Sequence, residues 1–155
     1  MPDTRVISRN PVDLLREEHD LLSSLLTAYE DLSWAQGSER VSLVRRIEGE
    51  IDRHIGLEEA LFYPTLLELR DPQIHERVGE AMAEHRMLEA RVGDLRRADP
   101  GGQTDLVIDV LKSLADRHLA FELKEILHLA SRLPRVTLNQ LGLEIEERRM
   151  KEHRF

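Results

Sequence analysis

Four histidines and two glutamates recur at spacings that suit metal binding. Two His-x-x-x-Glu motifs place an imidazole and a carboxylate one helical turn apart, and two further histidines each directly follow a glutamate. Imidazole nitrogens and carboxylate oxygens are together typical ligands of transition metals. The candidate ligands are His19, His54, Glu58, His85, His118 and Glu122.

These residues follow an internal repeat. The segment Glu18–Leu22 (EHDLL) recurs 66 residues later as Glu84–Leu88 (EHRML), and the His-x-x-x-Glu motif recurs after 64 residues. The repeat predicts two copies of a helical hairpin related by a pseudo-twofold axis. Each copy contributes one histidine from its first helix and one His/Glu pair from its second.

Each candidate lies on an apolar helix face. Around His19, for example, positions three, four and seven residues away hold Leu15, Leu22 and Leu26. A single histidine on such a face is more often a core residue than a ligand. Two buried carboxylates without cations, however, cost roughly several kcal/mol each, and no lysine or arginine shares these faces at that level. The cluster therefore predicts bound metal cations.

Composition and turn signals predict an all-α fold. Leu, Glu, Arg, Ala and Lys account for about half of the 155 residues, whereas Val, Ile and Thr are few. Pro64 should kink the second helix. The connections are short, which predicts an up-down-up-down four-helix bundle with a C-terminal tail helix. The expected helices span about 11–34, 38–70, 72–98 and 104–132, between an N-terminal arm over 1–9 and a tail over 133–155.

In such a bundle, candidates at equal distance from a connecting loop lie at equal height. The largest mismatch is three residues, or about 4.5 Å at 1.5 Å per residue, so all six should converge on one layer. This donor set excludes an all-oxygen calcium or magnesium site and exceeds the four ligands of one tetrahedral zinc. Two ions that share both carboxylates fit the count, with iron favoured and manganese or zinc as alternatives.

The motif set resembles that of the hemerythrin-like (HHE cation-binding) domains over residues 10–132. The run Glu58–Pro64 (EEALFYP) is similar to the acidic-then-proline segment that follows the second histidine of that family. The resemblance implies a four-helix bundle around an oxo- or hydroxo-bridged non-haem di-iron centre. It also implies that Glu58 and Glu122 bridge the two ions.

The sequence departs from the family pattern at two places. Glu89 stands one turn after His85, where oxygen carriers of the family have a further histidine. It could be a third carboxylate ligand, an acceptor for an imidazole N–H, or a proton donor, or it could turn to solvent. The second departure is Leu123–His128 (LKEILH), which lacks the proline of the earlier motif. The fourth helix is therefore expected to stay straight.

The apolar surroundings favour a small ligand over an organic substrate. The first hypothesis is a di-iron protein that binds or reacts with O2, peroxide or nitric oxide, in sensing or in oxidative and nitrosative stress protection. Iron storage or delivery is a second hypothesis, and a metal-stabilised interaction module without turnover is a third. The sequence contains no Ser/His/Asp set and no phosphate or dinucleotide loop, which disfavours the enzyme classes that depend on them. Whether the chain is an enzyme with a peroxide- or nitric oxide-reactive di-iron centre stays open.

Charge and residue content exclude other classes. The net charge of -8 disfavours nucleic-acid binding, and the lack of cysteine excludes disulfides and thiolate metal sites. No apolar run could serve as a signal peptide or span a membrane, so a cytoplasmic protein is expected. Leu138, Leu141 and Ile145 form a stripe in the tail helix that could dock on the bundle or pair two protomers. A monomer or a homodimer is expected.

Overall fold

A computed structural model describes residues 9–32 and 36–152, and within those ranges the chain is helical, without strands. Most of the expected arm and the end of the first expected helix lie outside the described residues. None of the described helices is long and apolar enough to cross a membrane. The elements are α1 (Pro11–Asp31), α2 (Gly37–Leu57), the π-helix η2 (Glu58–Phe62), α3 (Tyr63–Leu67), α4 (Pro72–Arg97), α5 (Gly102–Glu125), the 3-10 helix η3 (Leu127–Arg132) and α6 (Arg135–Glu152).

Two helix starts follow directly from local sequence. The Asn10 side chain accepts a hydrogen bond from the Val12 N–H at 2.9 Å, and proline occupies the first position of α1. The Asp71 side chain caps α4 in the same way, accepting from the Gln73 N–H at 2.9 Å. Between α4 and α5 the chain turns at Gly101, whose φ of 106° favours glycine.

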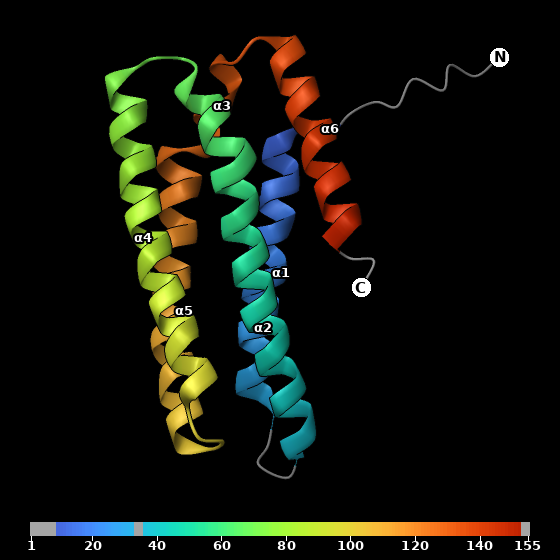
Figure 1. Ribbon diagram of the computed structural model, residues 1–155, viewed down its shortest axis with the longest axis vertical. Helices are drawn as coiled ribbons and strands as arrows, with labels where there is room; N and C mark the ends of the chain where they lie inside the picture. The colour runs from blue at the N-terminus through green and yellow to red at the C-terminus, as the bar shows by residue number, and fades with distance from the viewer. Residues whose placement is uncertain (1–8, 33–35, 153–155) are drawn as a thin grey trace, which may run out of the picture.

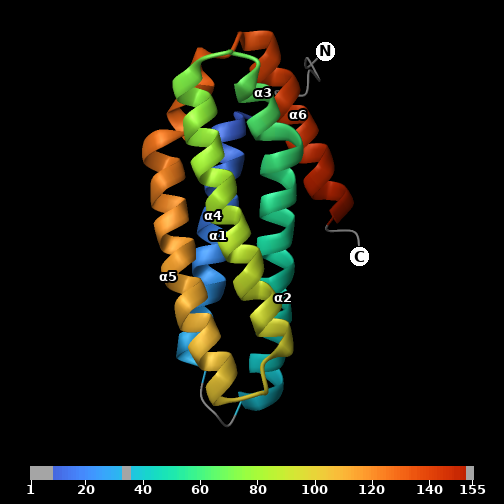
Figure 2. The same cartoon turned by 60° about the vertical axis from the view of Figure 1, so that its left-hand side comes forward.

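The long helices lie side by side along a common direction (Figure 1). α1 packs on α2 and α5, α4 packs on α2 and α5, and α6 packs on α1, α2 and η2. In both views α6 lies beside α2 and away from α4 and α5 (Figure 2). Leu141 and Ile145 of α6 are buried in the core, so this stripe docks on its own bundle. A side chain at Gly142 would collide with the backbone carbonyl of Arg9, so glycine permits this close approach.

The second long segment deforms earlier than Pro64. Its α-helical pattern gives way to the π-helix η2 at Glu58, and α3 resumes at Tyr63. Proline lacks an N–H, and its ring displaces the preceding carbonyls, so a wider turn directly before it absorbs the strain. Thr65 donates from its hydroxyl to the Leu61 carbonyl at 2.7 Å within this segment.

The expectation that the fourth helix stays straight is wrong. α5 ends at Glu125, and a 3-10 helix follows from Leu127 to Arg132. Leu127, Ala130 and Leu133 are all buried, and their three-residue spacing matches the period of a 3-10 helix. Burying this stripe therefore favours the tighter helix over continuation of α5.

Two apolar clusters form the core, and the candidate ligands lie between them. On α1, His19 falls between Leu15 of one cluster and Leu22 of the other. On α4, the candidate histidine falls likewise between Ala81 and Leu88. The bundle thus holds one polar layer between two apolar clusters.

Candidate metal centre

The structure brings the six candidates together in that layer. His19 comes from α1, His54 from α2, Glu58 from the first position of η2, and the others from α4 and α5. None of the six is more than 8% exposed. Ligand atoms of five of them lie within 4.8 Å of one another. The sixth, His19, places Nε2 at 2.9 Å from Oε2 of Glu122.

The histidines form two pairs. The ring centroids of His19 and His54 are 4.9 Å apart, and those of His85 and His118 are 4.7 Å apart. The ring centroid of His54 lies 6.2 Å from the ring centroids of both His85 and His118. Each pair could therefore supply two imidazoles to one ion.

The two carboxylates lie between these pairs. Oε2 of Glu122 is directed at His19, whereas Oε1 lies 3.3 Å from Nε2 of His118. Oε1 of Glu58 contacts Nε2 of His54 and lies 3.5 Å from Nε2 of His85. Both carboxylates thus reach both histidine pairs, as shared ligands of two ions would.

Unpartnered polar atoms show that the donor set fits a metal. Buried polar groups are normally hydrogen-bonded, and leaving them unpaired is costly. In this layer several ligand atoms make no hydrogen bond of normal geometry among the described residues, although some of them lie close to one another. They are Nε2 of His19, both ring nitrogens of His54, both oxygens of Glu58, Nδ1 of His85 and Oε2 of Glu122.

At three groups of the cluster, nearby opposite charges shift the pKa more than burial does. Burial raises the pKa of Glu58, but the neighbouring imidazoles, His54 foremost, hold it well below its usual range. Burial lowers the pKa of His54, yet Glu58 more than offsets this and the pKa is raised. For His118, the nearby carboxylates of Glu122 and Glu58 overcome burial and raise the pKa to about 11. Without metal, imidazolium charges therefore balance the carboxylates, a role that metal cations take over on binding.

Comparison with known proteins identifies the family. Residues 10–130 match the Hemerythrin HHE cation binding domain. The chain belongs to this family. A crystal structure of a hemerythrin HHE cation binding domain-containing protein from Mycobacterium kansasii shares the fold, with a TM-score of 0.80 and 20% identity over 93% of this chain and 87% of that one. No curated protein matches significantly. Membership in this cation-binding family implies that the His/Glu cluster is a metal-binding site.

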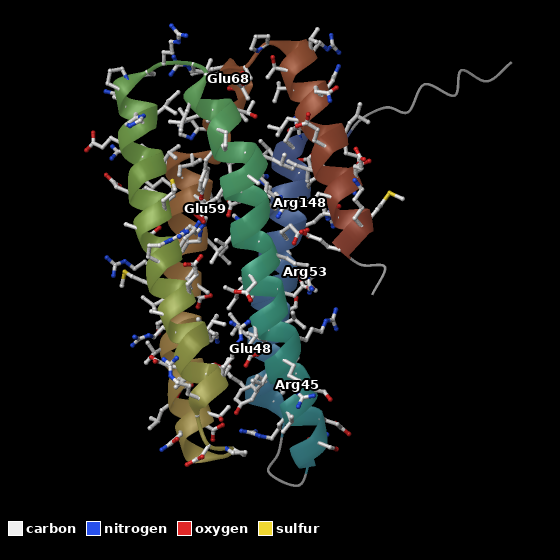
Figure 3. All side chains as sticks on the ribbon, viewed as in Figure 1. Arg45, Glu48, Arg53, Glu59, Glu68 and Arg148 are labelled. Carbon is white, nitrogen blue, oxygen red and sulfur yellow. The ribbon has the colours of Figure 1, made fainter. Side chains whose placement is uncertain are left out.

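Behind the hemerythrin-type cluster lie carboxylates that sequence reasoning did not assign. Nδ1 of His118 donates to Oε1 of Glu84 at 2.9 Å, and Glu84 remains 24% exposed. Nδ1 of His85 lies 3.4 Å from Oε2 of Glu59, which also binds Arg86. Figure 3 shows Glu59 on the side of its helix that faces α4. The signal for Glu84 was its place in the repeat, directly before His85. Its partner lies on the next helix, which the repeat alone does not reveal.

Tyr63 is a second residue that sequence reasoning did not assign. Its hydroxyl donates to Oε1 of Glu122, and its ring stacks on His85 at a centroid distance of 5.5 Å. Burial and the nearby Glu58 and Glu122 carboxylates raise its pKa. The neutral phenol therefore caps one side of the cluster.

Glu89 lies outside the cluster. Its side chain is 40% exposed and its Oε1 lies 3.3 Å from the Arg86 guanidinium. This placement corresponds to the alternative in which the side chain turns to solvent. Pairing with Arg86 and water avoids burying a third carboxylate. His75 and His128 are exposed as well, and His153 lies outside the described residues.

Proposed function

We propose that the chain holds two metal ions, preferably iron, in the polar layer. His19 and His54 would hold one ion, His85 and His118 the other, and both glutamates would be shared. The observation that carries this proposal is the orientation of Glu122, whose two oxygens are directed at different histidine pairs. Manganese and zinc suit the same ligands. The packing of consecutive long segments supports an up-down-up-down bundle around them.

We propose further that the centre binds or reacts with O2, peroxide or nitric oxide, in sensing or in stress protection. A pair of iron ions supplies one- and two-electron redox chemistry to such ligands. The protein contributes exclusion of water, because apolar clusters close both ends of the layer. Tyr63 contributes a hydroxyl that keeps its proton and donates a hydrogen bond to Oε1 of Glu122, one of the proposed metal ligands. The burial of the cluster supports a ligand of only a few atoms.

Metal analysis and spectra of the protein as isolated test this function. Two iron ions per chain and a visible spectrum that changes with azide, peroxide or nitric oxide are expected. Glu122→Ala, measured in parallel, should lose both metal and colour. A colourless protein loaded with zinc from iron-replete cells would instead favour a metal-stabilised interaction module, and coloured protein that is inert to all three ligands would favour iron storage or delivery.

A further inference from the structure

The two histidine pairs differ in the carboxylates that lie near their Nδ1 atoms, on the side away from the cluster. Glu84 accepts a hydrogen bond from Nδ1 of His118 at 2.9 Å, and Glu59 lies 3.4 Å from Nδ1 of His85. Nδ1 of His54 is buried and, like Nδ1 of His85, has no hydrogen-bond partner within 9–32 and 36–152. The second pair is therefore distinguished by the hydrogen bond between His118 and Glu84 and by the carboxylate of Glu59 beside His85. A carboxylate behind a metal-binding imidazole fixes its orientation and increases its basicity, which strengthens metal binding.

The internal repeat identifies the residue that would support His54. Glu18 is the counterpart of Glu84, because each directly precedes the candidate histidine of the first helix in its hairpin. α1 packs on α2, which carries His54, as α4 packs on α5, which carries His118. By this symmetry Glu18 is placed to serve His54 as Glu84 serves His118.

The C-terminal helix engages Glu18 instead. Nε of Arg149 lies 2.7 Å from Oε1 of Glu18, whose side chain is only 6% exposed. Shielded ion pairs of this kind are stronger than ordinary hydrogen bonds. α6 is held in register by buried Leu141 and Ile145. It packs on α1, α2 and η2, with Arg148 directed at α2 (Figure 3).

We propose that α6, through Arg149, makes the two metal positions unequal, an inference that rests on the two-metal centre proposed above. The position between His85 and His118 fills first and holds its ion more tightly. The position between His19 and His54 fills second and empties first, because Arg149 withholds the supporting carboxylate. Glu84 and Arg149 are thus positioning residues that act through imidazoles.

Stepwise loading of metal-free protein with Co2+ tests this inference. Cobalt absorption and calorimetry report the affinity of each step, and metal analysis counts the ions at saturation. Wild-type protein should bind two ions in steps that differ by about tenfold or more. Glu84→Gln should weaken the tighter step by about 10- to 100-fold. Its repeat counterpart, Glu18→Gln, should leave both steps within about twofold, because Glu18 is engaged by Arg149 of α6.

Arg149→Met completes the test by releasing Glu18 toward His54. The weaker step should tighten by about tenfold. Lys151→Met is the matched control on α6, because Lys151 is 71% exposed and pairs only with Glu147 among the described residues. It should leave both steps unchanged.

The outcomes separate this inference from the proposed function. Two ions bound with one indistinguishable affinity would overturn the inequality and leave the two-metal centre standing. Equal losses in Glu18→Gln and Glu84→Gln would also overturn it, even if Arg149→Met did not fold. Saturation below two ions per chain would overturn the two-metal centre itself, and the inequality with it.

Discussion

The hydroxyl of Tyr63 lies 3.3 Å from Nε2 of His85 while it donates a hydrogen bond to Glu122. A phenol from the segment after the π-helix therefore touches ligand candidates on both α4 and α5. The π-helix makes this contact possible, because its wider turn changes the direction of every side chain that follows.

Both tyrosines of the chain should ionise late. Burial and the carboxylates around it raise the pKa of Tyr63, and burial with the neighbouring Asp105 raises the pKa of Tyr29 to about 12. Because the folded pKa values exceed the unfolded value of about 10, this contribution to stability is complete below pH 10. It is lost as the pH rises toward 12. In an alkaline titration followed by tyrosinate absorbance, the folded protein should show little tyrosine ionisation at pH 10. Most of the tyrosinate signal should appear when the protein unfolds at higher pH.

Tyr29→Phe separates the two groups in that titration. The remaining signal should then come from Tyr63 and appear only with unfolding. A folded variant whose tyrosine titrates with a midpoint near pH 10 would contradict the buried contact with Glu122.

Metal removal should destabilise the protein. Without its ions, the layer depends on protonated imidazoles to balance its buried carboxylates and loses the free energy of metal binding, which costs about 3–5 kcal/mol. For a chain of this size each kcal/mol is worth about 2–4 °C, so the melting temperature should fall by roughly 10 °C. Melting before and after chelation measures this, and added metal should restore the original value. An unchanged melting temperature would mean that the ions do not stabilise this layer.

Loss of either shared carboxylate should release metal. Glu58→Ala and Glu122→Ala should each lose about half or more of the bound ions, since each carboxylate is proposed to reach both. Glu125→Ala is a control on the same helix as Glu122, because Glu125 is 31% exposed and faces Arg77. Metal analysis after extensive dialysis distinguishes them. Full occupancy in both cluster variants would refute the shared role.

Glu89 should be a bystander. Because its carboxylate pairs with Arg86 at the surface, Glu89→His should retain the metal content and the oxidation rate of the reduced protein in air. Stability should change by no more than about 0.5 kcal/mol. Spectra recorded after reduction and exposure to O2 provide the comparison. Slower oxidation in the variant would place Glu89 in the environment of the ions.

The amino-acid sequence alone predicts that six polar groups meet in one layer of a helical protein. Helix periodicity directs His19, His54 and their counterparts at the core, and the caps at Asn10 and Asp71 set the heights of α1 and α4. Helix periodicity and capping are local properties of short segments, so they can be predicted from the sequence without knowledge of the tertiary structure.

Only the tertiary structure determines which charged partners bind the glutamates at the edges of the core-facing helix surfaces. Glu18 and Glu84 occupy equivalent places in the repeat, yet Glu84 binds His118 and Glu18 binds Arg149 of α6. Glu89 likewise binds Arg86 and leaves the cluster. A flexible carboxylate at such an edge can reach several cations, and its choice depends on where helices distant in sequence come to pack.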